Sequence, residues 1–200
     1  MLQHLRPALV MTLLFTLLVG LVYPLAMTGV ATLVAPGRAG GSLVMRDGKP
    51  VGSELIGQAF TAPRYFHGRP SATSAPDPAD PDKTIDAPYN AANSSGSNLG
   101  PTSQKLVDRV KADVDAFRKD TGATEIPADA VTTSASGLDP HVSPQTALLQ
   151  VSRVAAARGL PEARVRGLVE AHVERPLLGI LGVDRVNVLL LNMDLDKIGP

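Results

Sequence analysis

The chain has 200 residues, no cysteine, and 19 Lys plus Arg against 19 Asp plus Glu, so its formal net charge is zero. The absence of cysteine excludes disulfides, thiolate nucleophiles and thiolate metal sites. The balanced charge excludes the basic surface of a nucleic-acid-binding protein, so we expect no nucleic-acid partner.

The first feature along the chain is a run without charge between Arg6 and Arg38. As a helix, residues 8–34 would extend about 40 Å, enough for a hydrocarbon core of about 30 Å. The small residues at 29–31 also suit a signal peptidase, but apolar regions of signal peptides run only about 7–15 residues. We therefore predict a membrane anchor over residues 1–37, embedded in a lipid bilayer, and one soluble domain over residues 38–200.

Small residues repeat every four positions within the predicted anchor, at Thr12, Thr16 and Gly20. This spacing places them on one helix face, where a second membrane helix could approach closely. Membrane helices are rich in Gly and Thr in any case, so the repeat fits a docking face and chance equally well. Pro24 removes a backbone donor and predicts a kink nearby.

The soluble part is expected to begin with a small hairpin over residues 43–51, which has Asp47-Gly48 at its turn. The aromatic residues Phe60, Tyr65 and Phe66 predict an ordered loop that is held by its rings. Residues 71–88 are rich in Pro and Asp, which predicts an exposed, mobile loop. Asp82-Lys83-Thr84 within this loop lacks the Gly-Thr that completes the phosphorylation motif of P-type ATPases.

Asn, Ser and Gly crowd residues 89–101, which predicts a shaped polar loop that is either structural or a binding surface. An apolar stripe then predicts a helix over residues 102–119, ending at Gly122. Ser143 and Pro144 are typical of a helix start, Gly159 ends that helix, and Leu160-Pro161 begins another. The apolar run over residues 185–192 predicts a buried C-terminal strand. The fold class is therefore α+β: one N-terminal transmembrane helix, then a single mixed soluble domain with about three helices and a small sheet.

One set of residues has the types that a hydrolase needs, namely Ser136 as nucleophile, Asp139 as orienting acid and His141 as base. Triad members normally meet across a fold rather than in neighbouring positions, so we treat a membrane-anchored hydrolase only as an alternative. The motifs of serine hydrolases, phosphate-binding loops and zinc proteases are missing. We predict no catalytic residue and no metal ligand.

A series of short motifs follows the anchor in a fixed order: 54–58 with Phe60, 65–71, 89–91, 94–101, 132–158, 186–188 and 191–192. The most specific motif is formed by Ser136, Gly137, Leu138, Asp139, Pro140 and His141, continued by 142–144 and joined to 150–155 with Arg153. In this order the motifs resemble the KdpC family, the C subunits of the bacterial high-affinity potassium-transporting P-type ATPase. The Pro/Asp-rich stretch over residues 75–86 is longer than is usual in that family.

The resemblance implies an accessory subunit that is not an enzyme by itself. Its partners would be the potassium-translocating KdpA, the phosphorylating KdpB and the small KdpF subunits. ATP and potassium would be handled by the complex, with no cofactor bound by this chain alone. The expected location is the bacterial plasma (inner) membrane, single-pass, with the N-terminus cytoplasmic and the soluble domain outside.

The resemblance leaves two roles to distinguish. In the preferred one, the chain stabilises assembly and its soluble domain covers the potassium entrance. In the other, it is a catalytic chaperone that raises the ATP affinity of the phosphorylating subunit, with Gln145 or Gln150 contacting the nucleotide. The two roles conflict because a domain outside the membrane cannot touch cytoplasmic ATP.

Overall fold

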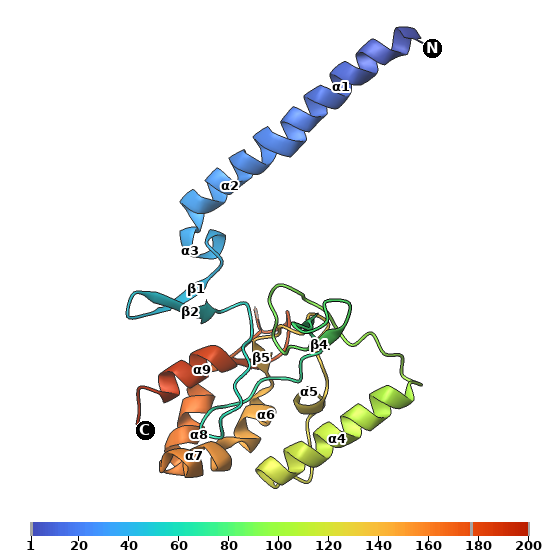
Figure 1. The fold of residues 1–200 in the computed structure, drawn as a ribbon. Helices are drawn as coiled ribbons and strands as arrows, with labels where there is room; N and C mark the ends of the chain where they lie inside the picture. The colour runs from blue at the N-terminus through green and yellow to red at the C-terminus, as the bar shows by residue number, and fades with distance from the viewer. Residues whose placement is uncertain (1, 177, 200) are drawn as a thin grey trace. The chain divides into compact units, whose positions relative to one another are not determined.

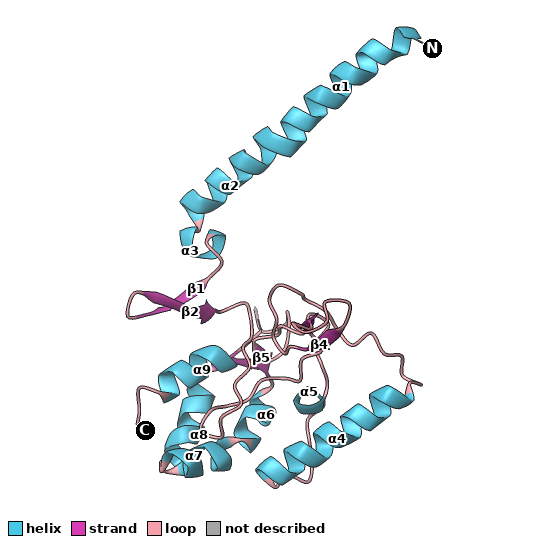
Figure 2. Ribbon diagram, viewed as in Figure 1, coloured by secondary structure: helices cyan, strands magenta, loops and turns pink. Residues whose placement is uncertain are grey.

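The computed structural model describes residues 2–176 and 178–199. They form two compact units, with the boundary between Ser53 and Glu54. This boundary lies beyond residue 37, where we placed the end of the anchor. Figures 1 and 2 show a long helix and a small hairpin in the first unit and a mixture of helices and short strands in the second. The predicted α+β class is confirmed.

The first unit is dominated by one helical rod (Figure 1) that is long and apolar enough to cross a membrane, Leu5–Val34. It comprises α1 (Leu5–Leu17), a π-helical stretch η2 (Leu18–Val22) and α2 (Tyr23–Val34), with the short turns η1 (Leu2–His4) and α3 (Pro36–Ala39) at its ends. The π-helical stretch ends directly before the turn that contains Pro24. A proline lacks an N–H and its ring crowds the carbonyl four residues earlier, so the wider turn accommodates it.

The predicted hairpin is confirmed as β1 (Leu43–Arg46) paired antiparallel with β2 (Lys49–Ser53). Asp47 and Gly48 connect the strands with φ angles of 52° and 76°. Two positive φ angles are what a tight two-residue turn requires, and Asp-Gly is one of the few pairs that adopt them readily.

The second unit is built around a three-stranded antiparallel sheet in the order β5-β7-β6 (His141–Val142, Arg185–Asn187, Val173–Glu174). Four helices complete its core: α6 (Pro144–Leu149), α7 (Val151–Arg158), α8 (Glu162–Ala171) and α9 (Val188–Leu195). Figure 1 shows α7, α8 and α9 side by side, in agreement with their contacts. The fully buried side chains at the centre include Phe66, Val154, Val165, Leu191 and Leu195.

The helix boundaries agree with the predicted caps, but one predicted helix is divided. Ser143 caps α6, and its side chain accepts a hydrogen bond from the N–H of Thr146. Gly159 ends α7 in the left-handed conformation, with φ 62°. The helix predicted between them is interrupted at Gln150, which lies between α6 and α7 and is buried.

The prediction of a C-terminal strand over residues 185–192 is wrong beyond Asn187. Strand β7 ends there, and the Asn187 side chain accepts a hydrogen bond of 3.2 Å from the N–H of Leu190, which caps helix α9. Leucine is a good helix former, and Asn is a favoured N-cap residue. The run is apolar because α9 buries Val188, Leu189, Leu191 and Leu195, not because it continues the sheet.

The region before the core contains α4 (Gln104–Thr121), α5 (Ala128–Val131) and a two-stranded hairpin of β3 (Ser74–Pro76) and β4 (Thr84–Asp86). Helix α4 confirms the prediction and ends at Gly122, which is left-handed. The hairpin lies within residues 71–88, where we predicted an exposed, mobile loop. Its connecting turn is largely exposed, whereas Thr73 at its base is buried. The mobility of this loop stays a prediction.

Candidate interaction surface around the signature loop

The most specific motif of the sequence, residues 136–141, forms a loop that we call the signature loop. Short polar side chains of this region fix its shape. The Ser134 hydroxyl accepts a hydrogen bond from the N–H of Gly137 at 2.9 Å, and the Ser136 hydroxyl accepts one from the N–H of Leu138 at 3.1 Å. The Asp139 carboxylate accepts the N–H of His141 at 3.0 Å. Such local bonds favour turns over regular structure, so these residues fix the backbone of the loop.

Gly137 is the point where three chain segments meet. Its φ of +66° lies in the left-handed region, and a Cβ there would lie 2.5 Å from Cγ2 of Thr73 and 2.6 Å from the carbonyl oxygen of Ser95. The Ser71 hydroxyl donates a hydrogen bond of 2.8 Å to the carbonyl of Gly137. The N–H of Ser95 donates one of 3.0 Å to the carbonyl of Ser136. Residues 71–73 and 94–95 thus hold the signature loop in place.

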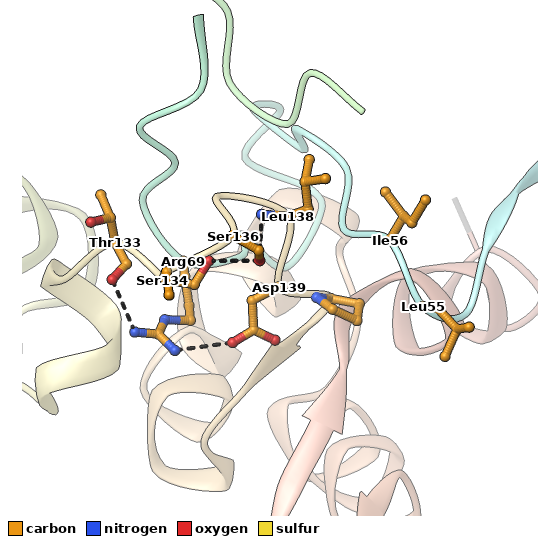
Figure 3. A pocket seen from close by; sticks show the side chains of 10 residues that line it. Leu55, Ile56, Arg69, Thr133, Ser134, Ser136, Leu138 and Asp139 are labelled. Atoms are coloured by element: carbon orange, nitrogen blue, oxygen red, sulfur yellow. Dashed lines mark hydrogen bonds and ion pairs between the residues drawn. The ribbon is translucent and has the colours of Figure 1, made fainter. Parts of the chain in front are cut away.

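A half-buried ion pair lies below the loop (Figure 3). Nη1 of Arg69 is 3.0 Å from Oδ2 of Asp139. Burial alone would raise the pKa of Asp139. Hydrogen bonds from His141 and Arg69 outweigh this effect and hold the pKa of Asp139 below its usual value. Nδ1 of His141 lies 3.6 Å from Asp139, and its Nε2 lies 3.9 Å from the carboxylate of Glu174. The carboxylate of Asp139 is therefore already paired inside the protein.

The hydrolase alternative requires Ser136, Asp139 and His141 to act together, and the structure does not arrange them in that way. The Ser136 hydroxyl bonds the N–H of Leu138 and lies 3.4 Å from the Ser134 hydroxyl. Among the described residues, no hydrogen bond joins Ser136 to His141. A catalytic serine needs a base within hydrogen-bond reach, so the geometry of a triad is absent here.

Next to the loop lies an open depression of about 580 Å³. Figure 3 shows Arg69 and Asp139 on one part of its lining and the side chains of Leu55, Ile56 and Leu138 on another. Leu55 is 64% exposed although it is aliphatic. We define the signature surface as the exposed or half-buried residues around this depression: Leu55, Ile56, Arg69, Ser134, Ser136, Leu138 and Asp139. It combines apolar side chains with fixed polar groups, as surfaces that bind other proteins do.

The two glutamines predicted to contact nucleotide lie in different environments. Gln145 is exposed on α6, whereas Gln150 is 1% exposed. The Gln150 amide oxygen accepts bonds of 2.7 Å from the N–H of His67 and from Arg153, and its amide nitrogen donates to the carbonyls of His67 and Thr146 at 3.1 and 3.3 Å. Gln150 therefore connects the aromatic loop to the core, with its amide fully occupied. A nucleotide contact at Gln145 or Gln150 stays a prediction.

Arg153 is the signature residue that lies outside 136–141, and it takes part with Gln150 in connecting the aromatic loop to the core. Its guanidinium donates to Gln150 and to the carbonyls of Pro63 and Tyr65, and its Nε lies 2.8 Å from the carboxylate of Asp120 on α4. These contacts join α4 and α7 to the loop that carries Phe66. Arg153 and residues 136–141 thus belong to two separate parts of the unit.

The proposed docking face of the anchor consists of exposed residues in the isolated chain, Thr12, Thr16 and Gly20. A Cβ at Gly20 would meet nothing within 4 Å. Gly20 belongs to the π-helical stretch Leu18–Val22. Docking through this face stays a prediction.

Sequence reasoning missed the roles of Arg69, Ser71, Thr73 and Tyr89. The hydroxyl of Tyr89 donates a hydrogen bond of 2.7 Å to the carbonyl of Arg69, and the N–H of Tyr89 donates one of 3.0 Å to Ser71. Burial, and secondarily Asp139, raises the pKa of Tyr89 to about 12. The sequence indicated Arg69, Ser71 and Tyr89 only through their place within motifs 65–71 and 89–91, and it gave no indication for Thr73. Nothing in the spacing indicated that Ser71 and Thr73 would contact residue 137.

The chain matches a family model described as "KdpC: K+-transporting ATPase, c chain" over residues 5–197. The chain belongs to the KdpC family. Curated relatives named "Potassium-transporting ATPase KdpC subunit" include that of Methylobacterium nodulans, 63% identical over 99% of this chain and 98% of the relative. The relative from Rhodopseudomonas palustris strain CGA009 is 60% identical over the full length of both chains. That from Bradyrhizobium diazoefficiens is 58% identical over 98% of each.

Membership of the KdpC family confirms the resemblance that the motifs indicated and places this chain among accessory subunits of a potassium-transporting ATPase. With its one apolar helix near the N-terminus, it fits a membrane-anchored, single-pass protein. The family match covers both compact units, so the apolar helix and the signature surface both lie within the part of the chain that the family shares.

Proposed function

We propose that the chain is a non-catalytic subunit that stabilises the assembled potassium pump and covers the potassium entrance with its second unit. One observation carries the proposal: the polar residues of the signature loop bond their own backbone and neighbouring segments, and the apolar side chains of Leu55 and Ile56 are presented beside them. This arrangement suits a shaped docking surface better than a reactive site.

The partners we propose are KdpA, which conducts potassium, KdpB, which is phosphorylated by ATP, and the small KdpF. ATP and potassium are then handled by these subunits, and this chain binds no cofactor alone. The printed names of the relatives, which describe subunits of a potassium-transporting ATPase, support an assignment to such a complex.

The decisive test is assembly of the complex with a changed signature surface. Leu55→Asp combined with Ile56→Asp places charges on exposed positions, so the second unit should fold, whereas docking should weaken. Val107→Asp is a matched control because Val107 is 52% exposed on α4. It is distant from the signature loop in sequence and does not line the depression beside that loop. We expect less KdpA and KdpB to co-purify with the double variant, and a lower potassium-stimulated ATPase activity per cell.

Normal assembly and activity of the double variant would contradict the proposed surface. The catalytic-chaperone alternative predicts a different result. If removal of the chain raised the KM for ATP while the other subunits still assembled, that alternative would replace the capping role.

We also propose that the N-terminus is cytoplasmic and that the second unit lies outside the bacterial plasma membrane. Native cysteine is absent, so single cysteines can report on topology. Asp82→Cys lies in the exposed turn of the β3–β4 hairpin, and Gln3→Cys lies before the apolar helix Leu5–Val34. An impermeant maleimide added to intact cells should label residue 82 but not residue 3. The reverse pattern would place the second unit inside the cell.

A further inference from the structure

Four strongly exposed apolar side chains of the second unit lie in one loop. Leu178, Ile180, Leu181 and Val183 are 82%, 78%, 61% and 77% exposed, and we call these four residues the apolar tip. No charged residue lies between Arg175 and Asp184. A soluble surface rarely exposes a contiguous set of aliphatic side chains, and where it does, the set usually contacts a membrane or another protein.

The position of the apolar tip in the fold explains why these side chains are not buried. Strands β6 and β7 are antiparallel neighbours, with Glu174 opposite Arg185, and residues 175–184 connect them. Nε of Arg185 lies 3.0 Å from the carboxylate of Glu174, which closes the base of the loop. The loop thus leaves the sheet and returns to it beside its starting point. None of the four side chains belongs to the hydrophobic core or to the residues packed against it.

The composition of the apolar tip favours a lipid phase over a protein partner. It contains only Leu, Ile and Val, whereas protein interfaces are enriched in aromatic residues, Met and Arg. Leu and Val are also under-represented among the residues that dominate protein–protein affinity. A fluid acyl phase requires no matching surface, so short aliphatic side chains on a glycine-containing loop are sufficient.

The chain carries a helix long and apolar enough to cross a membrane. The helix Leu5–Val34 is the membrane anchor, and the second unit begins at Glu54, only a short segment after its end. A compact unit of this size has a radius of gyration of about 15 Å, so such a segment keeps its whole surface within reach of the membrane. The cost of bringing the loop to a bilayer is thereby reduced, as for any tethered second contact.

We propose that the apolar tip inserts into the interfacial region of the same bilayer that the anchor crosses, as a second membrane contact. The inference rests on the anchor and on the exposure of these four side chains, not on the capping role. Charges at the base of the loop balance, with Arg175 and Arg185 against Glu174 and Asp184. Insertion is therefore driven by apolar transfer and needs no anionic lipid.

Quenching by lipid in vesicles tests the proposal with the full chain. A Leu181→Cys variant is labelled with an environment-sensitive fluorophore and reconstituted in phosphatidylethanolamine and phosphatidylglycerol vesicles that contain nitroxide-labelled phospholipid. Asp82→Cys, in the exposed turn of the β3–β4 hairpin, is the matched control. We expect a blue-shifted emission that the nitroxide quenches strongly at residue 181 and only weakly at residue 82.

Two further arms make the outcome specific. Leu178→Asp with Ile180→Asp in the Leu181→Cys chain should abolish the quenching, while circular dichroism shows an unchanged fold. Vesicles in which phosphatidylcholine replaces both other lipids, with the same content of nitroxide-labelled phospholipid, should preserve the quenching, and its loss there would overturn apolar insertion in favour of headgroup binding. Equal, weak quenching at both positions would overturn the proposal, and so would a blue shift without quenching, which would indicate that protein covers the loop. Neither result would affect the assembly tests above.

Discussion

Replacing Gln150 by Leu should destabilise the second unit strongly, although the two side chains are of comparable volume. Gln150 is buried between α6 and α7, and its amide makes four hydrogen bonds, two of them to the backbone of His67. Leu fills the space but forms none of these bonds. The N–H and carbonyl of His67 then lose their partner at a partly buried position.

The magnitude follows from those two backbone groups. A buried polar group without a partner costs about 1–3 kcal/mol, so the substitution should lower the free energy of unfolding by about 3 kcal/mol. For a protein of this size, the melting temperature should fall by about 6–12 °C. Folded domains are typically stable by about 5–15 kcal/mol, so the variant should still fold.

The assay is urea unfolding of the full chain in detergent, followed by circular dichroism. Gln145→Leu is the matched control because Gln145 is exposed on the same helical segment, and its substitution should change the free energy of unfolding by less than about 0.5 kcal/mol. If both variants were equally stable, the role of Gln150 as a connection between loop and core would be wrong.

Three further predictions test other parts of the chain. Gly137→Ala should cost about 2–4 kcal/mol of stability in urea unfolding because its Cβ would overlap Thr73 and Ser95, whereas Gly159→Ala, also left-handed but with open space, should cost only about 1 kcal/mol. The pKa of Tyr89 is raised from 10.0 to about 12, so the folded state holds the proton more tightly; this contribution is complete below about pH 10 and is lost as the pH rises towards about 12. Tyr89→Phe should remove that part of the alkaline stability loss, and an identical pH profile of both proteins would contradict the assignment. Gly20→Leu should reduce the yield of co-purified complex but not membrane insertion, because the larger side chain blocks close packing against another helix. Gly29→Leu is the control, since a Cβ at Gly29 also meets nothing within 4 Å. Equal yields of the two variants would exclude a docking face at Gly20.

Local signals made much of the fold predictable from sequence. Ser143 and Pro144 at a helix start, the left-handed glycines Gly122 and Gly159 at helix ends, and Asp47-Gly48 in a hairpin each act within a few residues. The uncharged run predicted the long apolar helix for the same reason, because its length and composition decide the matter without any tertiary contact.

The errors occurred where tertiary contacts decide between two local states. Residues 188–192 are a short apolar run that suits a buried strand or a buried helix equally well by composition. The Asn187 cap selects the helix, and the burial of Leu191 and Leu195 against the core stabilises it. Similarly, the hairpin in residues 71–88 depends on Thr73. The Thr73 hydroxyl donates a hydrogen bond of 2.6 Å to the carbonyl of Ala87 and accepts one of 3.0 Å from the N–H of Asn90.

The candidate surface could be located from the sequence but not understood from it. The types Ser, Asp and His at 136–141 are compatible with catalysis. In the structure, however, the side-chain oxygens of Ser136 and Asp139 each accept a backbone N–H two residues further on, and Asp139 also pairs with Arg69. Arg69 is seventy positions from Asp139, and no local pattern predicts such a contact.

The polar groups of the most specific motif are occupied in fixing the shape of their own loop, and a surface that binds a partner benefits from such a fixed shape. Residues 71–73, 94–95 and 136–139 lock one another around Gly137, and the aliphatic side chains of Leu55 and Ile56 lie beside this rigid frame. A rigid surface loses little conformational entropy when a partner binds to it. The same contacts then give a higher affinity than they would on a flexible surface. The separation of the signature into a loop frame at 136–141 and a core connection at Arg153 is then expected, since the first shapes the surface and the second holds the unit that carries it.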